Sequence, residues 1–88
     1  MKYHNEQEVA QKVLDYVKEE LEGICEYNEL YESLRAIGLN DEAIDIEKIA
    51  SDEYRHADKL WRMLGNFDIN VPQTINELWD KVEEIFDK

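Results

Sequence analysis

The sequence predicts an all-α protein, and three observations support this fold class. Apolar residues recur at intervals of three and four along two long segments, which is the spacing of one face of a helix in a bundle. The 88 residues include only three glycines and one proline, and all of these except Gly23 fall where helices are expected to stop or start. No segment alternates apolar and polar residues in the pattern of a half-buried strand. We therefore expect long helices joined by short connections.

The first helix is expected over about residues 6–37. Asn5 and Glu8 have the spacing of a capping box, which satisfies backbone N–H groups that the start of a helix leaves free. Gly23 is the only weak position inside the segment, at a cost of about 1 kcal/mol relative to alanine. Gly38 stands where the end of a helix commonly needs a residue in the left-handed conformation.

The second helix is expected over about residues 41–64, with its start signal at Asn40 and Asp41 and its end at Gly65. Only Leu39 and Asn40 separate it from the first helix. So short a connection makes the two helices neighbours that run in opposite directions. The sequence thus predicts an antiparallel helical hairpin.

The third helix is expected over about residues 73–87, after a loop. Pro72 is favourable at the start of a helix, and Thr74 and Glu77 have the spacing of a second capping box. The apolar residues of this helix fall on one side, and they are Ile75, Leu78, Trp79, Val82, Ile85 and Phe86. We expect this side to pack across the hairpin or against a neighbouring subunit.

The composition narrows the classes of function. Asp and Glu number 22 against 10 Lys and Arg, a net charge of −12, so we expect neither nucleic acids nor membranes as partners. The single Cys25 excludes an internal disulfide and a Cys-x-x-Cys metal module, and we expect it to be a small buried residue. Apolar runs never exceed two residues, so we expect no membrane span or signal peptide and a cytoplasmic location. A single domain of this length buries only about 60–65% of its unfolded surface, which favours self-association.

Each helix of the hairpin carries a seam of residues spaced three and four apart. In the first helix this seam consists of Val13, Val17, Glu20, Ile24, Tyr27, Tyr31 and Leu34. In the second helix it consists of Ile46, Ile49, Glu53, His56, Leu60, Met63 and Phe67. The period predicts near-parallel packing of the helices in a left-handed bundle.

Only three seam positions carry groups that ionise near neutral pH, namely Glu20, Glu53 and His56. They lie 19 residues before Leu39 and 14 and 17 residues after it, which at about 1.5 Å per residue places them roughly 28, 21 and 26 Å from the turn. All three can therefore reach one point. A buried carboxylate needs a partner, and neither seam contains a Lys or Arg. Carboxylate and imidazole ligands without a thiolate suit iron, manganese or zinc.

Two other interpretations of these residues stay open. A Glu-x-x-His pattern is weak evidence by itself in a chain with 14 Glu, and seams rotated by one residue would place all three side chains at the surface. Alternatively, the side chains form a hydrogen-bond network between subunits without a metal. The other histidine, His4, lies outside both seams and is expected at the surface.

The number of candidate ligands predicts a homodimer. One chain offers two carboxylates and one imidazole. A di-metal site in a four-helix bundle uses four carboxylates and two imidazoles from four helices. A two-fold axis through the site would supply this set from two hairpins and would complete the bundle.

Residues 19–27 (EELEGICEY) and 46–64 (IEKIASDEYRHADKLWRML) resemble the ferritin-like superfamily. The likeness is strongest to the di-iron domain of rubrerythrin and to short chains of the encapsulated-ferritin type. In these families a Glu in the first helix precedes the Glu of the Glu-x-x-His motif by about thirty residues, and a Tyr follows that first Glu by seven. The resemblance covers residues 13–64. The chain departs from full ferritins and rubrerythrins in having a single hairpin, and it carries no rubredoxin module and no targeting tail of the kind that encapsulin shells recognise.

The resemblance implies a role for each matching residue. Glu20 and His56 would be terminal ligands of a di-iron centre, with two irons per dimer, and Glu53 would bridge both metals; manganese or zinc could substitute for iron. Tyr27 would donate its hydroxyl to a ligand carboxylate, and its alternative role is an aromatic residue that fills the core.

The resemblance also implies an activity, the oxidation of Fe(II) by O₂ or peroxide at a site shared across a homodimer or higher oligomer. One alternative is a rubrerythrin-like peroxide reductase that takes electrons from an external donor. A second alternative is a helical oligomerisation module without catalysis, in which the two carboxylates and the imidazole simply pair across the interface.

Overall fold

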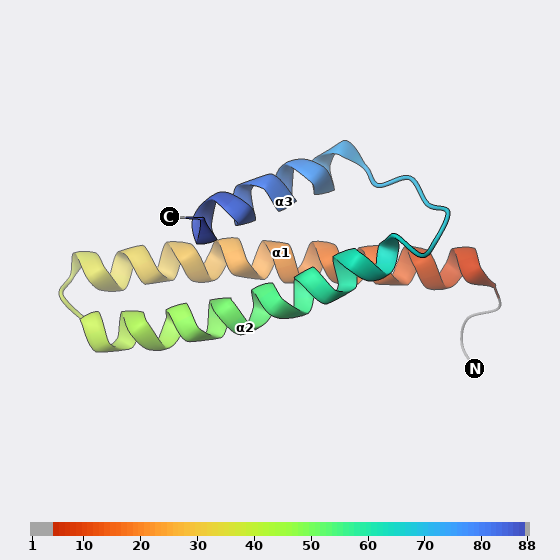
Figure 1. Cartoon of the computed structure of the whole chain (residues 1–88). Helices are drawn as coiled ribbons and strands as arrows, with labels where there is room; N and C mark the ends of the chain where they lie inside the picture. The colour runs from red at the N-terminus through yellow and green to blue at the C-terminus, as the bar shows by residue number, and fades with distance from the viewer. Residues whose placement is uncertain (1–4, 88) are drawn as a thin grey trace.

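The computed structural model describes residues 5–87 and is all-helical, with no strand in that range. Its helices are α1 (Glu6–Ala36), α2 (Asn40–Leu64) and α3 (Gln73–Phe86). Figure 1 shows that α1 and α2 form a long antiparallel hairpin and that α3 returns over it after an extended loop. For these residues the predicted all-α class is confirmed. None of these helices is both long and apolar enough to cross a membrane.

Local signals at both ends of α1 act as predicted. The side chain of Asn5 accepts a hydrogen bond from the backbone N–H of Glu8 at 2.9 Å, so the first turn is capped. Gly38 has φ +84°, the left-handed conformation that favours glycine. The N–H of Leu39 then donates to the carbonyl of Leu34 at 2.9 Å, the bond that closes a Schellman turn.

The start of α3 differs from the prediction, because the capping box of Thr74 and Glu77 is absent. Pro72 caps the helix instead, with φ −57° and ψ 145°, and no side chain caps it. The carbonyl of Pro72 accepts hydrogen bonds from the N–H groups of Ile75 and Asn76 at 3.0 and 3.2 Å. The proline ring fixes φ near a helical value, so the helix begins directly after it and Thr74 falls inside the first turn.

The core lies where the three helices meet. Its buried side chains from α1 and α3 include Val13, Leu14, Val17, Leu21, Ile24, Ile75 and Val82. Those from α2 are Ala43, Ala50, Ala57 and Leu64. On α1 these positions include apolar members of the predicted seam. Since α3 buries Ile75 and Val82 in the same cluster, it packs across its own hairpin, the first of the two expected placements.

The buried face of α2 differs from its predicted seam. Its buried residues recur every seven positions and are mostly alanine, whose small side chain lets two helices approach closely. Ile49 and Met63 of the predicted seam are instead 41% and 42% exposed, and the side chain of His56 is 59% exposed. Each precedes a buried residue by one position, about 100° around the helix. In the single chain the seam therefore lies beside the contact with α1 rather than in it, because the narrow contact admits only small side chains.

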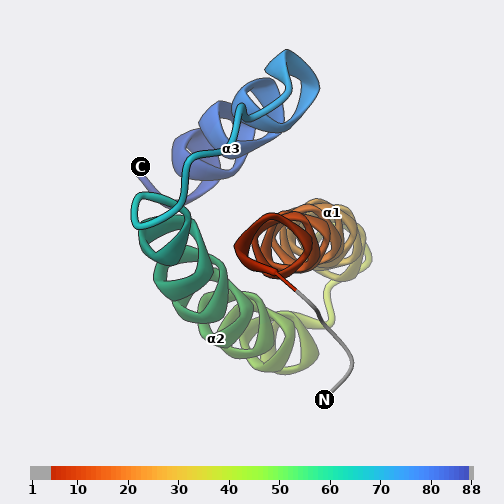
Figure 2. The same cartoon turned by 90° about the vertical axis from the view of Figure 1, so that its right-hand side faces the viewer.

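Helix α3 covers one side of the hairpin (Figure 2). Tyr54 and Trp61 of α2 stack on aromatic rings of α3, namely those of Trp79 and Phe86. His56 follows Tyr54 by two residues, which turns it about 200° around α2, so it lies on the side away from α3. We call this uncovered side, which carries Glu20, His56 and Ile49, the open face.

The alanine row yields a stability prediction. Ala57 is 0% exposed, so Ala57→Leu should lower the free energy of unfolding by about 1–3 kcal/mol because the larger side chain forces α2 away from α1. Urea unfolding followed by circular dichroism measures this. The same substitution at the exposed Ala36 is the matched control and should change stability by less than about 0.5 kcal/mol. Equal effects at the two positions would contradict the close packing of the hairpin.

Candidate metal centre

The structure brings the three predicted ligand residues together. Glu20 lies in the middle of α1, and Glu53 and His56 lie one turn apart on α2. One ligand atom from each, a carboxylate oxygen or a ring nitrogen, lies within 4.8 Å of the other two. The convergence follows from the antiparallel hairpin, which places equal distances from the turn side by side. We call these three residues the acid–histidine cluster.

The cluster sits at the edge of the core rather than inside it. Glu20 and Glu53 are half-buried, with the Glu53 side chain 30% exposed, and His56 opens to solvent on the open face. Within residues 5–87, the oxygen Oε2 of Glu20 is buried and has no hydrogen-bond partner. The Nδ1 atom of His56 lies 3.9 Å from Oε1 of Glu53, within ion-pair range but too far for a hydrogen bond.

The two carboxyl groups perturb each other. The pKa of Glu20 is raised from 4.5 to about 7, first because it can share a proton with Glu53, then because of burial and the negative charges of Glu53 and Glu19. In the described part of the chain, neither Glu20 nor Glu53 forms an ion pair with a Lys or Arg. A proton or a cation is therefore needed between the carboxyl groups near neutral pH.

The donor set fits a divalent transition metal. Two carboxylates and one neutral imidazole are ligands for iron, manganese or zinc, and the unpartnered Oε2 of Glu20 is available for coordination. Three side chains do not complete a four- or six-coordinate shell, so water, substrate or a second chain would supply the remaining ligands. A shared proton also relieves the repulsion, and the geometry is compatible with either occupant.

Tyr27 lies one heptad beyond Glu20 on α1 and is half-buried. It lines a groove of about 390 Å³ between the hairpin and the end of α3, with Tyr31, Ala50 and Phe86 among its other walls. Within residues 5–87 no hydrogen bond joins the Tyr27 hydroxyl to the cluster, and its donation to a ligand carboxylate stays a prediction. Cys25 is half-buried, and burial raises the pKa of its thiol. His4 lies outside the described residues.

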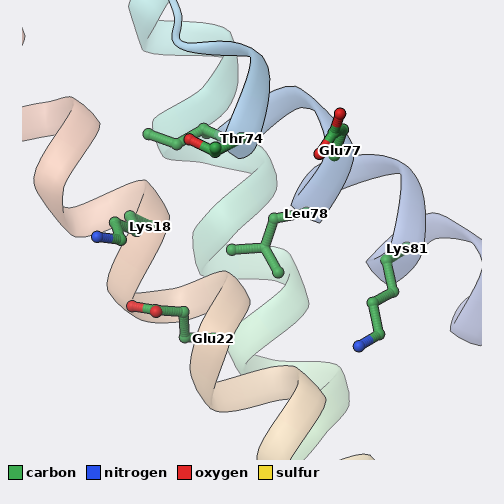
Figure 3. A pocket seen from close by; sticks show the side chains of 7 residues that line it. Lys18, Glu22, Thr74, Glu77, Leu78 and Lys81 are labelled. Atoms are coloured by element: carbon green, nitrogen blue, oxygen red, sulfur yellow. The ribbon is translucent and has the colours of Figure 1, made fainter.

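A second groove, of about 330 Å³, runs between α1 and α3. Figure 3 shows its charged side chains, which carry both signs and point in different directions rather than at one centre. They belong to Lys18, Glu22, Glu77 and Lys81. A ligand site needs polar groups that converge, so this groove does not compete with the acid–histidine cluster.

Comparison with known proteins identifies no relative: no family model, curated protein or solved structure matches this chain. The acid–histidine cluster therefore rests on its own geometry. Sequence reasoning placed its three residues together, and it covered the solvent exposure of His56 only through the alternative of a seam rotated by one residue. The alanine row is the signal that could have revealed it, because small residues every seven positions mark the closest face of a helix pair.

The raised pKa of Glu20 predicts a pH-dependent stability for the metal-free protein. The folded chain holds the proton on Glu20 up to pH about 7, and the unfolded chain holds it only up to about 4.5. The stability that this proton gives the folded state is therefore fully present below pH 4.5 and is lost as the pH rises to 7. Glu20→Gln should remove this loss. Its free energy of unfolding, compared with that of the wild type, should be about 1 kcal/mol higher at pH 8 than at pH 5, a value reduced for solvent screening.

Urea unfolding in a chelating buffer at pH 5 and pH 8 measures the effect. Glu29→Gln, at an exposed position on the same helix, is the control and should follow the wild-type pH profile. Parallel profiles for wild type and Glu20→Gln would show that the carboxyl groups do not interact.

Proposed function

We propose that two copies of this chain hold a pair of iron ions between them and oxidise Fe(II) with O₂ or peroxide, in the manner of the ferritin-like proteins that its sequence resembles. The observation that carries this proposal is the acid–histidine cluster, in which one ligand atom from each of the three residues lies within 4.8 Å of the other two and one oxygen of Glu20 is buried without a hydrogen-bond partner. Each chain would contribute Glu20 and His56 as terminal ligands and Glu53 as a bridging carboxylate.

The position of the cluster favours a second copy of the chain. His56 projects into solvent on the open face, so a metal bound by the cluster would take its remaining ligands from outside the hairpin. A second hairpin against this face would bring two further carboxylates and one imidazole, the full set of a carboxylate di-metal site. A two-fold axis near the cluster achieves this with one self-complementary surface.

Apolar side chains on both helices support the same contact. On α1, Tyr16, Gly23 and Leu30 recur every seven residues, and Tyr16 and Leu30 are 44% and 45% exposed. On α2, Ile49, His56 and Met63 recur in the same way. Gly23 follows Glu20 by three residues, and His56 follows Glu53 by three. Each row therefore lies beside a glutamate of the cluster, on the open face. Exposed rows with this period are what a four-helix bundle buries.

Gly23 strengthens the argument for a closely packed partner. It lies in the middle of a 31-residue helix, where glycine costs about 1 kcal/mol relative to alanine. A Cβ atom at this position would meet nothing within 4 Å, so packing within the chain does not require a glycine. The close approach of a helix from a second copy would explain it, since the backbone there carries no side chain.

In this proposal the metal would supply the electrons, and the side chains of the cluster would bind it and balance its charge. When bound, iron supplies electrons as Fe(II) becomes Fe(III). Glu20 and Glu53 compensate for the added positive charge, and Glu20 releases its proton as the metal binds. His56 binds through a neutral ring nitrogen, and its exposure leaves a path for iron and oxidant from the open face.

The exposed rows also favour a second candidate, an oligomerisation module without catalysis. In that case a proton shared by Glu20 and Glu53 would take the place of the metal, and dimerisation would bury the apolar rows alone. A peroxide reductase would use the same ligands as the oxidase but would need an external electron donor. Metal titration and re-reduction of the ferric protein separate these functions.

The metal content gives the first test. Anaerobic titration of the metal-free protein with Fe(II), followed by native mass spectrometry, should saturate at two irons per two chains. Glu53→Gln should lower the iron affinity at least tenfold, because it removes the proposed bridging carboxylate. Glu42→Gln, at an exposed position on the same helix, is the matched control and should bind as the wild type does.

Adding O₂ or peroxide then distinguishes the activities. Stable ferric product indicates an oxidase, and rapid return to Fe(II) with a reduced electron donor indicates a peroxide reductase. If iron does not bind, or binds equally well to Glu53→Gln, the di-iron proposal is wrong and the oligomerisation module remains.

The open face gives a second test. Ile49→Lys should raise the dimer dissociation constant at least tenfold, because it places a charge in the proposed interface. Ile44→Lys is the matched control, since Ile44 is 49% exposed but lies about 140° away around α2. Sedimentation velocity over a range of concentrations measures both. Equal weakening by the two substitutions, or a wild-type monomer that metal does not dimerise, would contradict the proposed interface.

A further inference from the structure

Four aromatic rings form a continuous stack between α2 and α3. The rings of Trp61 and Trp79 are 4.7 Å apart between centroids and nearly parallel, at 3°. Tyr54 lies 5.9 Å from Trp79 at 19° and 4.6 Å from Phe86 at 27°. These separations are those of interacting aromatic pairs. We call Tyr54, Trp61, Trp79 and Phe86 the aromatic stack.

The aromatic stack starts one residue from a proposed metal ligand. Tyr54 follows Glu53 directly, and its ring points to the α3 side of α2 while Glu53 joins the cluster. The polypeptide thus links the cluster to the stack through a single peptide unit. All four rings are half-buried, so solvent reaches the stack on the side of the molecule opposite the open face.

The chemistry of the rings determines which of them can carry an electron. Phenol and indole side chains lose one electron more readily than any other common side chain except thiols, whereas the benzene ring of Phe86 does not. An electron vacancy that enters at Tyr54 can therefore pass to Trp79 and then to Trp61, but not to Phe86.

We propose that Tyr54, Trp79 and Trp61 form a relay that supplies single electrons to the metal centre from a reductant at the outer surface of α2 and α3. This inference rests on the proposed di-iron function. Peroxide needs two electrons and two protons to become two waters, and a centre that holds one Fe(II) supplies one electron. The Tyr54 phenol gives the second electron and one proton, and solvent gives the other proton.

The vacancy then moves outward along the stack. The Tyr54 radical regains an electron and a proton from the indole of Trp79, which regains them in turn from Trp61. At the surface, a small hydrogen-atom donor such as ascorbate loses one electron and one proton and restores Trp61. The relay thereby completes peroxide reduction and prevents a one-electron oxidant from remaining beside the ligands Glu20 and His56.

The test uses the whole chain loaded anaerobically with one Fe(II) per two chains, after the bound iron has been counted. One equivalent of hydrogen peroxide is added without ascorbate, the sample is frozen rapidly for electron paramagnetic resonance, and a parallel sample is digested for peptide mass mapping. We expect an organic radical in the frozen sample. In the parallel sample, which is exposed to air before digestion so that O₂ adds to the indole radical, we expect added oxygen at Trp61 and Trp79. Ascorbate present from the start should suppress both, and protein loaded with zinc should show neither.

Substitutions in the aromatic stack distinguish a role of its rings in electron transfer from a role in packing alone. Trp79→Phe keeps a stacked ring but not its redox chemistry, and it should lower oxidation at Trp61 several-fold, while Trp79→Tyr should restore it. Tyr54→Phe should remove the radical and protect both tryptophans, whereas Tyr31→Phe, outside the stack, should change nothing. Thermal unfolding confirms that each variant is folded.

The relay is overturned if Trp61 is oxidised equally in the wild type and in Trp79→Phe, or if oxidation is concentrated at Tyr27. Protein that binds iron and consumes peroxide without oxidising the stack also overturns it and leaves the di-iron function standing. Protein that binds no iron overturns both, and the iron count made before peroxide addition distinguishes the two failures.

Discussion

Two carboxyl groups, those of Glu20 and Glu53, meet between α1 and α2 without a Lys or Arg paired to either of them in the range 5–87. Near neutral pH their repulsion has to be relieved by a proton or a cation, and the pKa of about 7 for Glu20 expresses this need. Hydrophobic packing cannot supply the missing charge. Apolar residues would serve stability better at this place, so the carboxyl pair supports our proposal that the site holds a cation.

The two sides of the hairpin differ in what covers them. On one side, α3 seals the core with the aromatic stack and with buried residues such as Ile75 and Val82. On the other side, the row of alanines draws α2 close to α1 and displaces His56 and its apolar neighbours outward. In our proposal, the single chain therefore carries half of a metal site on the open face. A second copy of the chain would complete the site and cover the face in one step.

Much of the fold could be predicted from sequence because its signals are local. Asn5 and Gly38 mark the ends of α1 through their own hydrogen bonds and backbone conformation. The convergence of the cluster followed from counting residues outward from the turn, since helix rise is constant. The orientation of α2 could not be predicted, because Ile49 and Met63 dominate the apolar pattern while Ala50 and Ala57 make the contact. Periodicity shows that a face is buried, but it does not show whether the same chain or another buries it.

The central claim is that the cluster is half of a metal site shared by two chains. X-ray diffraction from crystals grown with iron, with data collected at the iron absorption edge, tests it most directly. The account predicts two adjacent peaks of anomalous scattering beside a two-fold axis, about 3.5–4 Å apart, each near Glu20, Glu53 and His56. Dimers whose cluster holds no metal, or iron bound by one chain at some other place, would contradict it.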